Sequence, residues 1–198
     1  MTDETATLFP VSDADLTSLR NRLTTTAEQS GDLDVSYDLT TTPIGTLLVA
    51  ATAHGVVRVA FESEDFDTVL DSLAARIGPN ILRAPEPLAT ATTQLREYFA
   101  GQRRTFDVPL DYRLSSGFRQ SVQQHLLEIG YGHTATYKAV AELVGRPTAV
   151  RAVGTACATN PLPILLPCHR VLRSDGGLGG YLGGLDAKTA LLDLESAA

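Results

Sequence analysis

The chain contains few of the features that would narrow its function at once. Its 198 residues include only two cysteines, Cys157 and Cys168, and no tryptophan. Two cysteines cannot form the disulfide framework of a small secreted domain, so both are expected as thiols in a reducing compartment. No apolar run approaches the roughly 18 residues of a membrane helix, and the acidic start MTDETATLFP lacks the pattern of a signal peptide. These absences predict a globular, cytoplasmic protein with no membrane attachment.

Positive charge is scarce as well, because the net charge is −7. Phosphate contacts need Lys and Arg, so this excess of acidic residues argues at first against a nucleic-acid partner. The charge is unevenly divided, however. Residues 1–112 carry 8 Lys and Arg against 17 Asp and Glu, whereas residues 113–198 carry 8 against 6. A small excess of positive charge is often only a solvated surface, so it does not by itself indicate a nucleic-acid partner. It leaves such a partner possible for residues 113–198.

The first half has the pattern of a small α+β domain that follows an acidic extension. Residues 1–34 form the extension, with one helix expected from a cap at Ser12 towards Glu28. Residues 35–112 form the domain. Its three strands, at 35–39, 46–53 and 56–62, predict an antiparallel meander, and helical spacing predicts helices over 66–77 and 88–99.

The second half, residues 113–198, is predicted to be mainly helical. An extended linker over 105–117 leads into it, and Ser116 is placed to cap a helix that ends at Gly130. Two shorter helices follow, one capped at Thr134 or Thr136 and ending near Val144, the other running over 147–160. Two short helices joined by a turn that contains glycine are the outline of a helix-turn-helix.

The second of these short helices has few large side chains. Most of its residues are small, and Arg151 alone has a long side chain that projects from it. The small residues are Ala149, Ala152, Gly154, Thr155, Ala156 and Ala158. Small residues allow close approach to another surface, with Arg151 reaching beyond it. A tightly packed buried helix, with Arg151 paired to a carboxylate, fits the same composition. Composition alone leaves both interpretations open.

The stretch ILLPCHRVLRSDGG places Cys168 and His169 side by side. A zinc site is disfavoured, because the remaining histidines and Cys157 show no recognisable ligand spacing. A thiol protease pair is disfavoured too, since neighbours in an extended segment project to opposite sides and could meet only through a water. A buried free cysteine is the common alternative. The prolines at 161, 163 and 167 favour a cysteine held in a fixed place.

The motifs around Cys168 resemble one family. NPLPILLPCHRVLRSDGGLGGYLGGLDAKTALLDLE, preceded by YGHTATYKAVAELVGRPTAVRAVG, resembles the methylated-DNA–protein-cysteine methyltransferases, which repair O6-alkylguanine. The resemblance extends upstream through TPIGTLLVAAT and LREYFAGQRRTFDVPLD, so it covers about Val35 to Glu195. It implies an α+β fold, with a ribonuclease-H-like N-terminal domain and a mainly helical C-terminal domain that contains the helix-turn-helix.

The resemblance also implies roles for individual residues. Cys168 matches the alkyl acceptor, while His169 and Glu195 match the groups that remove its proton through a water. Asn160 matches the residue that braces the turn before the cysteine, and Tyr181 matches the tyrosine whose hydroxyl faces the guanine O6. The residues that match the DNA-contacting positions lie on the helix-turn-helix: Tyr137, Arg151, Ala152, Gly154 and Thr155. Tyr137 and Arg151 would turn the phosphate and fill the gap left by the extruded base, with the second helix in the minor groove.

These roles imply a single-turnover methyltransferase whose partner is double-stranded DNA containing O6-alkylguanine, with O4-methylthymine as a second candidate base. No metal is expected, because the zinc ligands that some relatives carry are absent. No cofactor or obligate protein partner is expected either. The chain departs from the family's usual residues at Gln123, Gly130 and His133, which affect packing rather than chemistry. Two other classes compete with this one: a non-catalytic relative that binds alkylated DNA, which would lack Cys168, and a helix-turn-helix regulator, for which the second helix has too few base-reading side chains.

Overall fold

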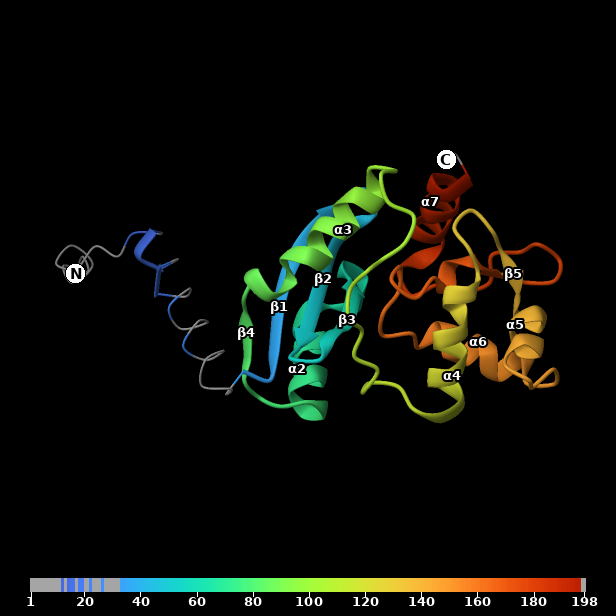
Figure 1. Ribbon diagram of the computed structural model, residues 1–198, viewed down its shortest axis with the longest axis horizontal. Helices are drawn as coiled ribbons and strands as arrows, with labels where there is room; N and C mark the ends of the chain where they lie inside the picture. Colours follow the sequence, from blue (N-terminus) through green and yellow to red (C-terminus); the bar gives the residue numbers. More distant parts are fainter. Residues whose placement is uncertain are drawn as a thin grey trace, which may run out of the picture.

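A computed structural model describes residues 33–196, together with residues 12, 14–16, 18, 19, 22 and 26 (Figure 1). Ser12 caps a helical segment as expected: its hydroxyl accepts from the Asp15 amide at 3.1 Å, and the Asp15 carboxylate accepts from the Ser12 amide at 3.0 Å. The expected end of this helix near Glu28 lies outside the described residues. Among the helices that are described, none is long and apolar enough to cross a membrane.

The predicted meander is confirmed, and it belongs to a four-stranded mixed sheet. Strands β1 (Val35–Thr42), β2 (Gly45–Thr52) and β3 (Gly55–Phe61) pair antiparallel in sequence, and β4 (Ile81–Arg83) pairs parallel with β1. The strand order is therefore β3-β2-β1-β4. The sequence did not predict β4, because three residues are too few to show the alternation of a strand.

Helices cover both faces of this sheet (Figure 1). Alternate residues of β2 face opposite sides: Leu48 packs in the cluster that includes Leu73 of α2 (Phe66–Arg76), whereas Leu47 packs in the cluster that includes Leu95 of α3 (Ala89–Phe99). Residues 47–51 are all buried. A strand covered on both faces needs an unbroken apolar run, which explains why the sequence there reads LLVAA rather than alternating with polar residues.

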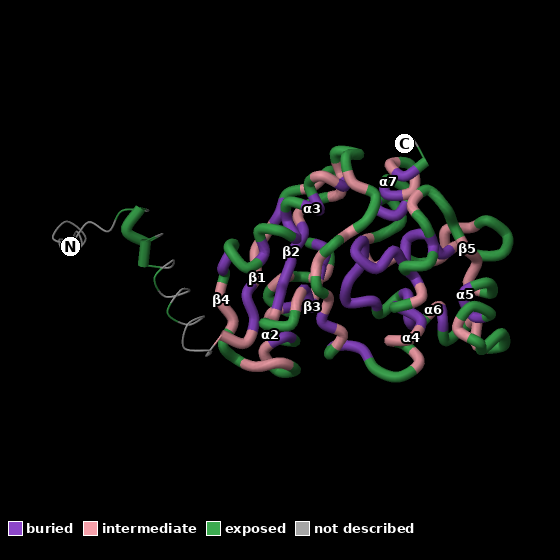
Figure 2. Tube along the Cα trace, in the orientation of Figure 1, coloured by how far each residue is buried: buried purple, intermediate pink, exposed green. Residues whose placement is uncertain are grey.

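The second half is helical, as predicted. Its elements are α4 (Gly117–His125), β5 (Ala135–Thr136), α5 (Tyr137–Leu143), α6 (Val150–Ala158), β6 (Val171–Leu172) and α7 (Gly184–Ser196). The apolar cluster on the α3 side of the sheet continues without a break into this half, through residues such as Val153 and Leu191. Figure 2 shows the buried trace running from β2 and β3 into the turns between α6 and α7. The two halves share one core.

The helix-turn-helix forms with slightly different limits from those expected. Thr136, one of the two candidate caps, accepts from the Ala139 amide through Oγ1 at 3.1 Å and starts α5. Helix α6 begins at Val150 rather than at Pro147, because residues 146–149 first close a turn through a hydrogen bond from the Ala149 amide to the Arg146 carbonyl at 2.8 Å. Helix α7 had no separate prediction.

The turn between β2 and β3 gives a test of the fold. Gly55 has a φ of +134°, and a Cβ placed there would lie 2.3 Å from the carbonyl oxygen of Pro109, which accepts from the Val56 amide. We expect Gly55→Ala to lower the free energy of unfolding by about 2 kcal/mol, measured by urea denaturation. Gly154→Ala is the control: a Cβ there meets no atom within 4 Å. That change should leave stability unaltered or raise it by up to about 1 kcal/mol. Equal losses in both variants would contradict the packing described.

Candidate active site

Cys168 lies at the start of a short 3₁₀ turn, Cys168–Arg170, and is 3% exposed. Its Sγ accepts a hydrogen bond from Nδ2 of Asn160 at 3.2 Å. The expectation of an extended segment here is wrong, because Pro167 leads directly into the turn and the Arg170 amide bonds back to the Pro167 carbonyl at 3.0 Å. Among the described residues, no hydrogen bond joins the side chains of Cys168 and His169, in agreement with the expectation that they do not touch directly.

Asn160 braces the segment before the cysteine. Besides the bond to sulfur, its Nδ2 donates to the Leu166 carbonyl at 2.9 Å, and its Oδ1 accepts from the Leu162 amide at 3.0 Å. Asn160 is 1% exposed, so its amide is bonded at both ends in a buried position. The loop that ends at Cys168 is thereby held to the end of α6, which fixes the position of the sulfur.

His169 pairs with Glu195, which lies in the last turn of α7. The His169 Nε2 is 2.9 Å from Oε1 of Glu195, and both residues are buried. An imidazole that donates from Nε2 to a carboxylate has its lone pair on Nδ1. That Nδ1 is buried and has no hydrogen-bond partner among the described residues. Burial lowers the pKa of His169 despite the carboxylate, so the ring is neutral at pH 7 and can accept a proton.

Glu195 accepts hydrogen bonds from several elements besides His169. Arg170 donates through Nε to Oε2 at 2.8 Å and through a terminal nitrogen to Oε1 at 2.9 Å, and the Gly132 amide donates at 3.2 Å. Tyr98 of α3 donates its hydroxyl to Oε1 at 2.7 Å. Burial alone would raise the pKa of Glu195, but the bonds from His169, Arg170 and Tyr98 hold it well below its usual range. The carboxylate is therefore ionised throughout the neutral range.

The thiol of Cys168 is protonated in the resting protein. Burial raises the pKa of Cys168 to about 11, although the Asn160 hydrogen bond and the charge of Lys188 oppose this. Since the thiolate is the nucleophile, the proton must leave as part of the reaction. Cys157 is also buried and free, and burial raises the pKa of its thiol further. Among the described residues, no group of three or more His, Cys, Asp or Glu is placed to hold a metal ion.

Tyr181 lies on the loop between β6 and α7. Its hydroxyl is buried with no hydrogen-bond partner among the described residues, and burial holds its pKa well above 10, so it stays a proton donor. The ring packs edge-on against Phe61 of β3, with centroids 5.5 Å apart. A Cβ at Gly179, on the same loop, would lie 2.7 Å from the hydroxyl of Tyr137. The hydroxyl of Tyr137 therefore lies close to the loop that carries Tyr181.

Lys188 and two other residues of this site were missed by the sequence analysis. The Lys188 side chain is fully buried, and its Nζ donates to the carbonyls of Val171 and Leu178, which joins β6 to the loop that carries Tyr181. Tyr98 and Arg170 were missed as partners of Glu195. Both lie within stretches that carry the family resemblance, which was the available signal, but no spacing rule connects them to a carboxylate far along the chain.

Helix α6 presents the remaining predicted residues on a separate, outward face. Arg151, Ala152 and Thr155 are exposed, and Gly154 is half-buried, whereas the opposite face packs into the core. Arg151 forms no ion pair with any described residue, unlike the paired arginine of the buried-helix interpretation. Gln123 of α4 is buried and donates to the Ala156 carbonyl at 3.1 Å, so this departure from the family's residue still ties α4 to α6.

A buried thiol with an adjacent imidazole and carboxylate, set behind an exposed helix of small residues, defines a cysteine-dependent group-transfer protein built on a helix-turn-helix. Residues 35–112 match the model of the 6-O-methylguanine DNA methyltransferase ribonuclease-like domain, and residues 117–197 match that of the DNA binding domain of the same family. The chain belongs to the 6-O-methylguanine DNA methyltransferase family. The expected fold class, a ribonuclease-like α+β domain followed by a helical DNA-binding domain, is confirmed.

Individual relatives agree with this assignment. The methylated-DNA–protein-cysteine methyltransferase of Methanosarcina barkeri is 39% identical over 159 residues, which cover 80% of this chain and 96% of the relative. The constitutive enzyme of that name from Bacillus subtilis is 39% identical over 163 residues, covering 80% and 94%. The crystal structure of the Mycobacterium tuberculosis O6-methylguanine methyltransferase superposes with a TM-score of 0.73 at 37% identity, covering 82% and 93%. Its complex with DNA superposes with a TM-score of 0.72 at the same identity.

The hydrogen bond from Tyr98 to Glu195 gives a pH-dependent test of this network. We expect Tyr98→Phe to lower the free energy of unfolding at pH 7 by about 1.5 kcal/mol, because the ionised carboxylate loses a donor. The pKa of Glu195 is lowered in the folded protein, so its contribution is complete above the unfolded value of about 4.3 and is lost as the pH falls below it. The unfolded pKa is common to Tyr98→Phe and the parent, so the difference between them in urea denaturation should stay constant from pH 7 down to about pH 4 and shrink only at lower pH, where the folded carboxylate itself takes up a proton. A difference that already shrinks between pH 7 and pH 5 would mean that the hydroxyl does not act on the ionised carboxylate.

Proposed function

We propose that this protein repairs O6-alkylguanine in double-stranded DNA by moving the alkyl group to Sγ of Cys168, once per chain. The observation that carries the proposal is the buried His169–Glu195 pair beside a buried thiol, with the imidazole Nδ1 left without a partner. Such a pair supplies a base where the thiol needs one. Relatives with names for this activity, at about 40% identity over most of the chain, support it further.

Each buried group has one role in the proposed reaction. Glu195 holds the His169 ring so that Nδ1 can take the Cys168 proton through a water, and the sulfur then attacks the alkyl carbon. The carbon–oxygen bond breaks, its electron pair passes to the guanine, and a thioether remains on Cys168. Tyr181 is the donor that meets charge on the departing base, for which a hydroxyl with a raised pKa is suited. Asn160 keeps the sulfur in place throughout.

DNA recognition is assigned to the helix-turn-helix. The target carbon of an alkylated guanine lies inside the duplex stack, so the nucleotide must turn outward at a cost of a few kcal/mol. Helix α6 would enter the minor groove with its small residues Ala152, Gly154 and Thr155 against the DNA. Arg151 would fill the space left in the stack, and Tyr137 would turn the phosphate. The outward, unpaired position of Arg151 supports this role.

The proposal includes three further points. Residues 35–112 and 113–198 act as two domains, with residues 1–34 as an extension. The reaction takes place in the cytoplasm, where both thiols stay reduced. A non-catalytic DNA-binding protein and a helix-turn-helix regulator are the competing classes, and both would bind DNA without becoming alkylated.

Stoichiometry tests the proposed chemistry directly. Alkylated Cys168 is a neutral thioether with no nucleophile placed to remove the group, so we expect a labelled O6-methylguanine duplex to transfer one methyl per chain and no more. Cys168→Ala should abolish transfer while retaining duplex binding. Cys157→Ala is the matched control and should retain full transfer, because burial raises the pKa of that thiol.

Peptide mass spectrometry identifies the labelled residue in the same experiment. Several equivalents converted per chain, or label on Cys157, would show that the mechanism is wrong. Tight duplex binding with no label on any residue would favour the non-catalytic class instead.

The flipping step has its own test. We expect Arg151→Ala and Tyr137→Ala to slow repair of duplex DNA far more than reaction with free O6-benzylguanine, because the free base needs no extrusion. Single-turnover rates with the two substrates give the ratio for each variant. Equal losses on both substrates would assign these side chains a structural role in place of a DNA-binding one.

A further inference from the structure

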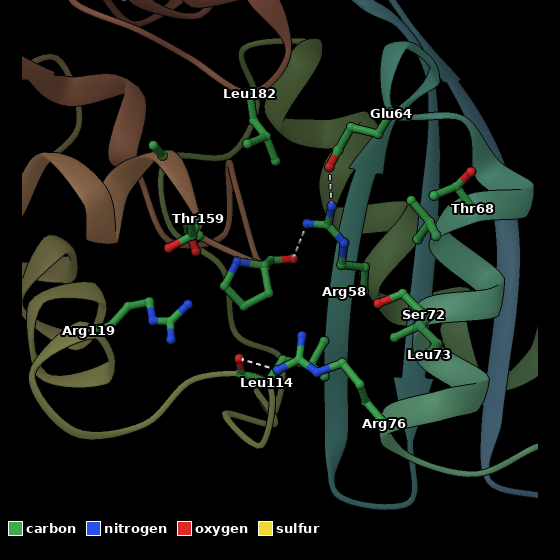
Figure 3. Close-up of a pocket in the computed structure, with 14 residues that line it drawn as sticks. Arg58, Glu64, Thr68, Ser72, Leu73, Arg76, Leu114, Arg119, Thr159 and Leu182 are labelled. Carbon is green, nitrogen blue, oxygen red and sulfur yellow. Dashed lines mark hydrogen bonds and ion pairs between the residues drawn. The ribbon is translucent and has the colours of Figure 1, made fainter.

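A cavity of about 440 Å³ lies apart from the thiol, between the N-terminal sheet and the helix-turn-helix. Figure 3 shows three arginine side chains directed into it from different elements: Arg58 from β3, Arg76 from α2 and Arg119 from α4. Among the described residues, the only carboxylate that lines it is that of Glu64. In a chain of net charge −7, this cavity is a local concentration of positive charge.

The partners of these arginines leave most of that charge uncompensated. Arg58 forms an ion pair with Glu64 and donates to the Pro161 carbonyl at 3.3 Å. Arg76 donates to the Leu114 carbonyl at 2.9 Å, which is a neutral acceptor. Arg119 makes no hydrogen bond or ion pair with any described residue, and it is exposed on the cavity side of α4 (Figure 3). Two of the three guanidinium charges therefore have no opposing charge in the cavity.

Electrostatics favour an anion in this position. Burial lowers the pKa of Arg58, the Glu64 carboxylate opposes this, and the nearby charge of Arg76 acts with burial, so the two guanidinium groups repel each other across the cavity. A guanidinium group is a planar fork of donors that matches the oxygens of a phosphate. The Ser72 hydroxyl lines the same space and can add a further donor, whereas the hydroxyls of Thr68 and Thr159 already donate to the Asp65 carboxylate and the Thr155 carbonyl.

We propose that this cavity is an anion site, which binds a phosphate group between Arg76 and Arg119 with Arg58 behind it. The phosphate can come from the backbone of bound DNA or from a free pyrophosphate or nucleotide. The DNA source rests on the proposed function. Ala158 and Thr159, at the end of α6, line the cavity, and Thr159 lies about 12 Å along the helix axis from Arg151, a span that one duplex can contact at both ends.

The position of the cavity connects this site to the nucleophile. Asn160 and Pro161 form part of its wall, and Asn160 is the residue whose amide donates to Sγ of Cys168. A bound phosphate would therefore lie against the turn that fixes the sulfur.

Free phosphate is tested with pyrophosphate. Titration at constant ionic strength, followed by the NMR signals of the ¹⁵N-labelled arginine side chains, should give saturable shifts of Arg76 and Arg119. Arg119→Ala should weaken pyrophosphate binding about tenfold, and the Arg76→Ala/Arg119→Ala double variant should weaken it more. Arg119 has no hydrogen-bond or ion-pair partner in the part of the chain that the structure describes, so its single variant keeps the test independent of folding. Arg83→Ala is the control, since Arg83 lies on β4 and pairs with Asp38.

The backbone source is tested with an unmodified duplex. The slope of log affinity against log salt should become less steep by about one for each arginine that contacts a phosphate, and Arg83→Ala should leave it unchanged. A change with pyrophosphate alone assigns a free ligand, and a change in slope alone assigns the DNA backbone. No effect in either experiment, or the same effect in Arg83→Ala, overturns the site. Benzyl transfer from free O6-benzylguanine, measured on the same variants, reports separately on the proposed function.

Discussion

The carboxylate of Glu195 is the group on which the arrangement of the site depends. It sits nearly buried at the end of α7, a position where an unpaired charge would be strongly unfavourable. Its donors come from three separate segments: His169 and Arg170 of the 3₁₀ turn, Gly132 of the loop before β5, and Tyr98 of α3. Each segment that donates is fixed relative to the others. Loss of the carboxylate would leave the buried Arg170 without an opposing charge, although it would keep its bond to the Ile129 carbonyl, and such a change typically costs about 3–5 kcal/mol.

The N-terminal half carries none of the proposed catalytic residues, yet it supports the site at three places. Tyr98 donates to Glu195, and Phe61 packs against Tyr181. The Val59 amide of β3 donates to the Pro161 carbonyl at 2.8 Å, next to Asn160. The shared apolar core makes these contacts rigid, because the sheet and the helical half cannot move apart without exposing it. The two halves are therefore better regarded as one support for the thiol than as a catalytic domain with an unrelated partner.

Local patterns in the sequence predicted the elements, while contacts between distant segments could not be predicted from it. The meander and the two short helices follow from periodicity and caps, and Cys168, His169 and Asn160 lie within one short motif. No local motif marked Tyr98 or Lys188 as part of the site, because the amphipathic pattern of a helix is ordinarily enough to explain a tyrosine or a lysine on it. The 3₁₀ turn at Cys168 was missed because its shape depends on Pro167 and on the Asn160 brace rather than on the propensity of the residues within it. Strand β4 is held by its pairing with β1, which no pattern of three residues can show.

Burial of the thiol has a consequence for its selectivity. With the pKa of Cys168 raised to about 11, about one thiol in ten thousand is ionised at pH 7. An exposed thiolate would react with any alkylating agent or oxidant, whereas this thiol is 3% exposed and mainly protonated. In the proposed reaction, the alkyl carbon of the substrate is brought to the sulfur while the proton moves to His169, whose ring is neutral and whose position is fixed by Glu195. The same burial that suppresses the free thiolate therefore restricts the proposed reaction to an alkylated nucleobase that is delivered into the site. The Glu195 network keeps His169 ready to take the proton at that moment.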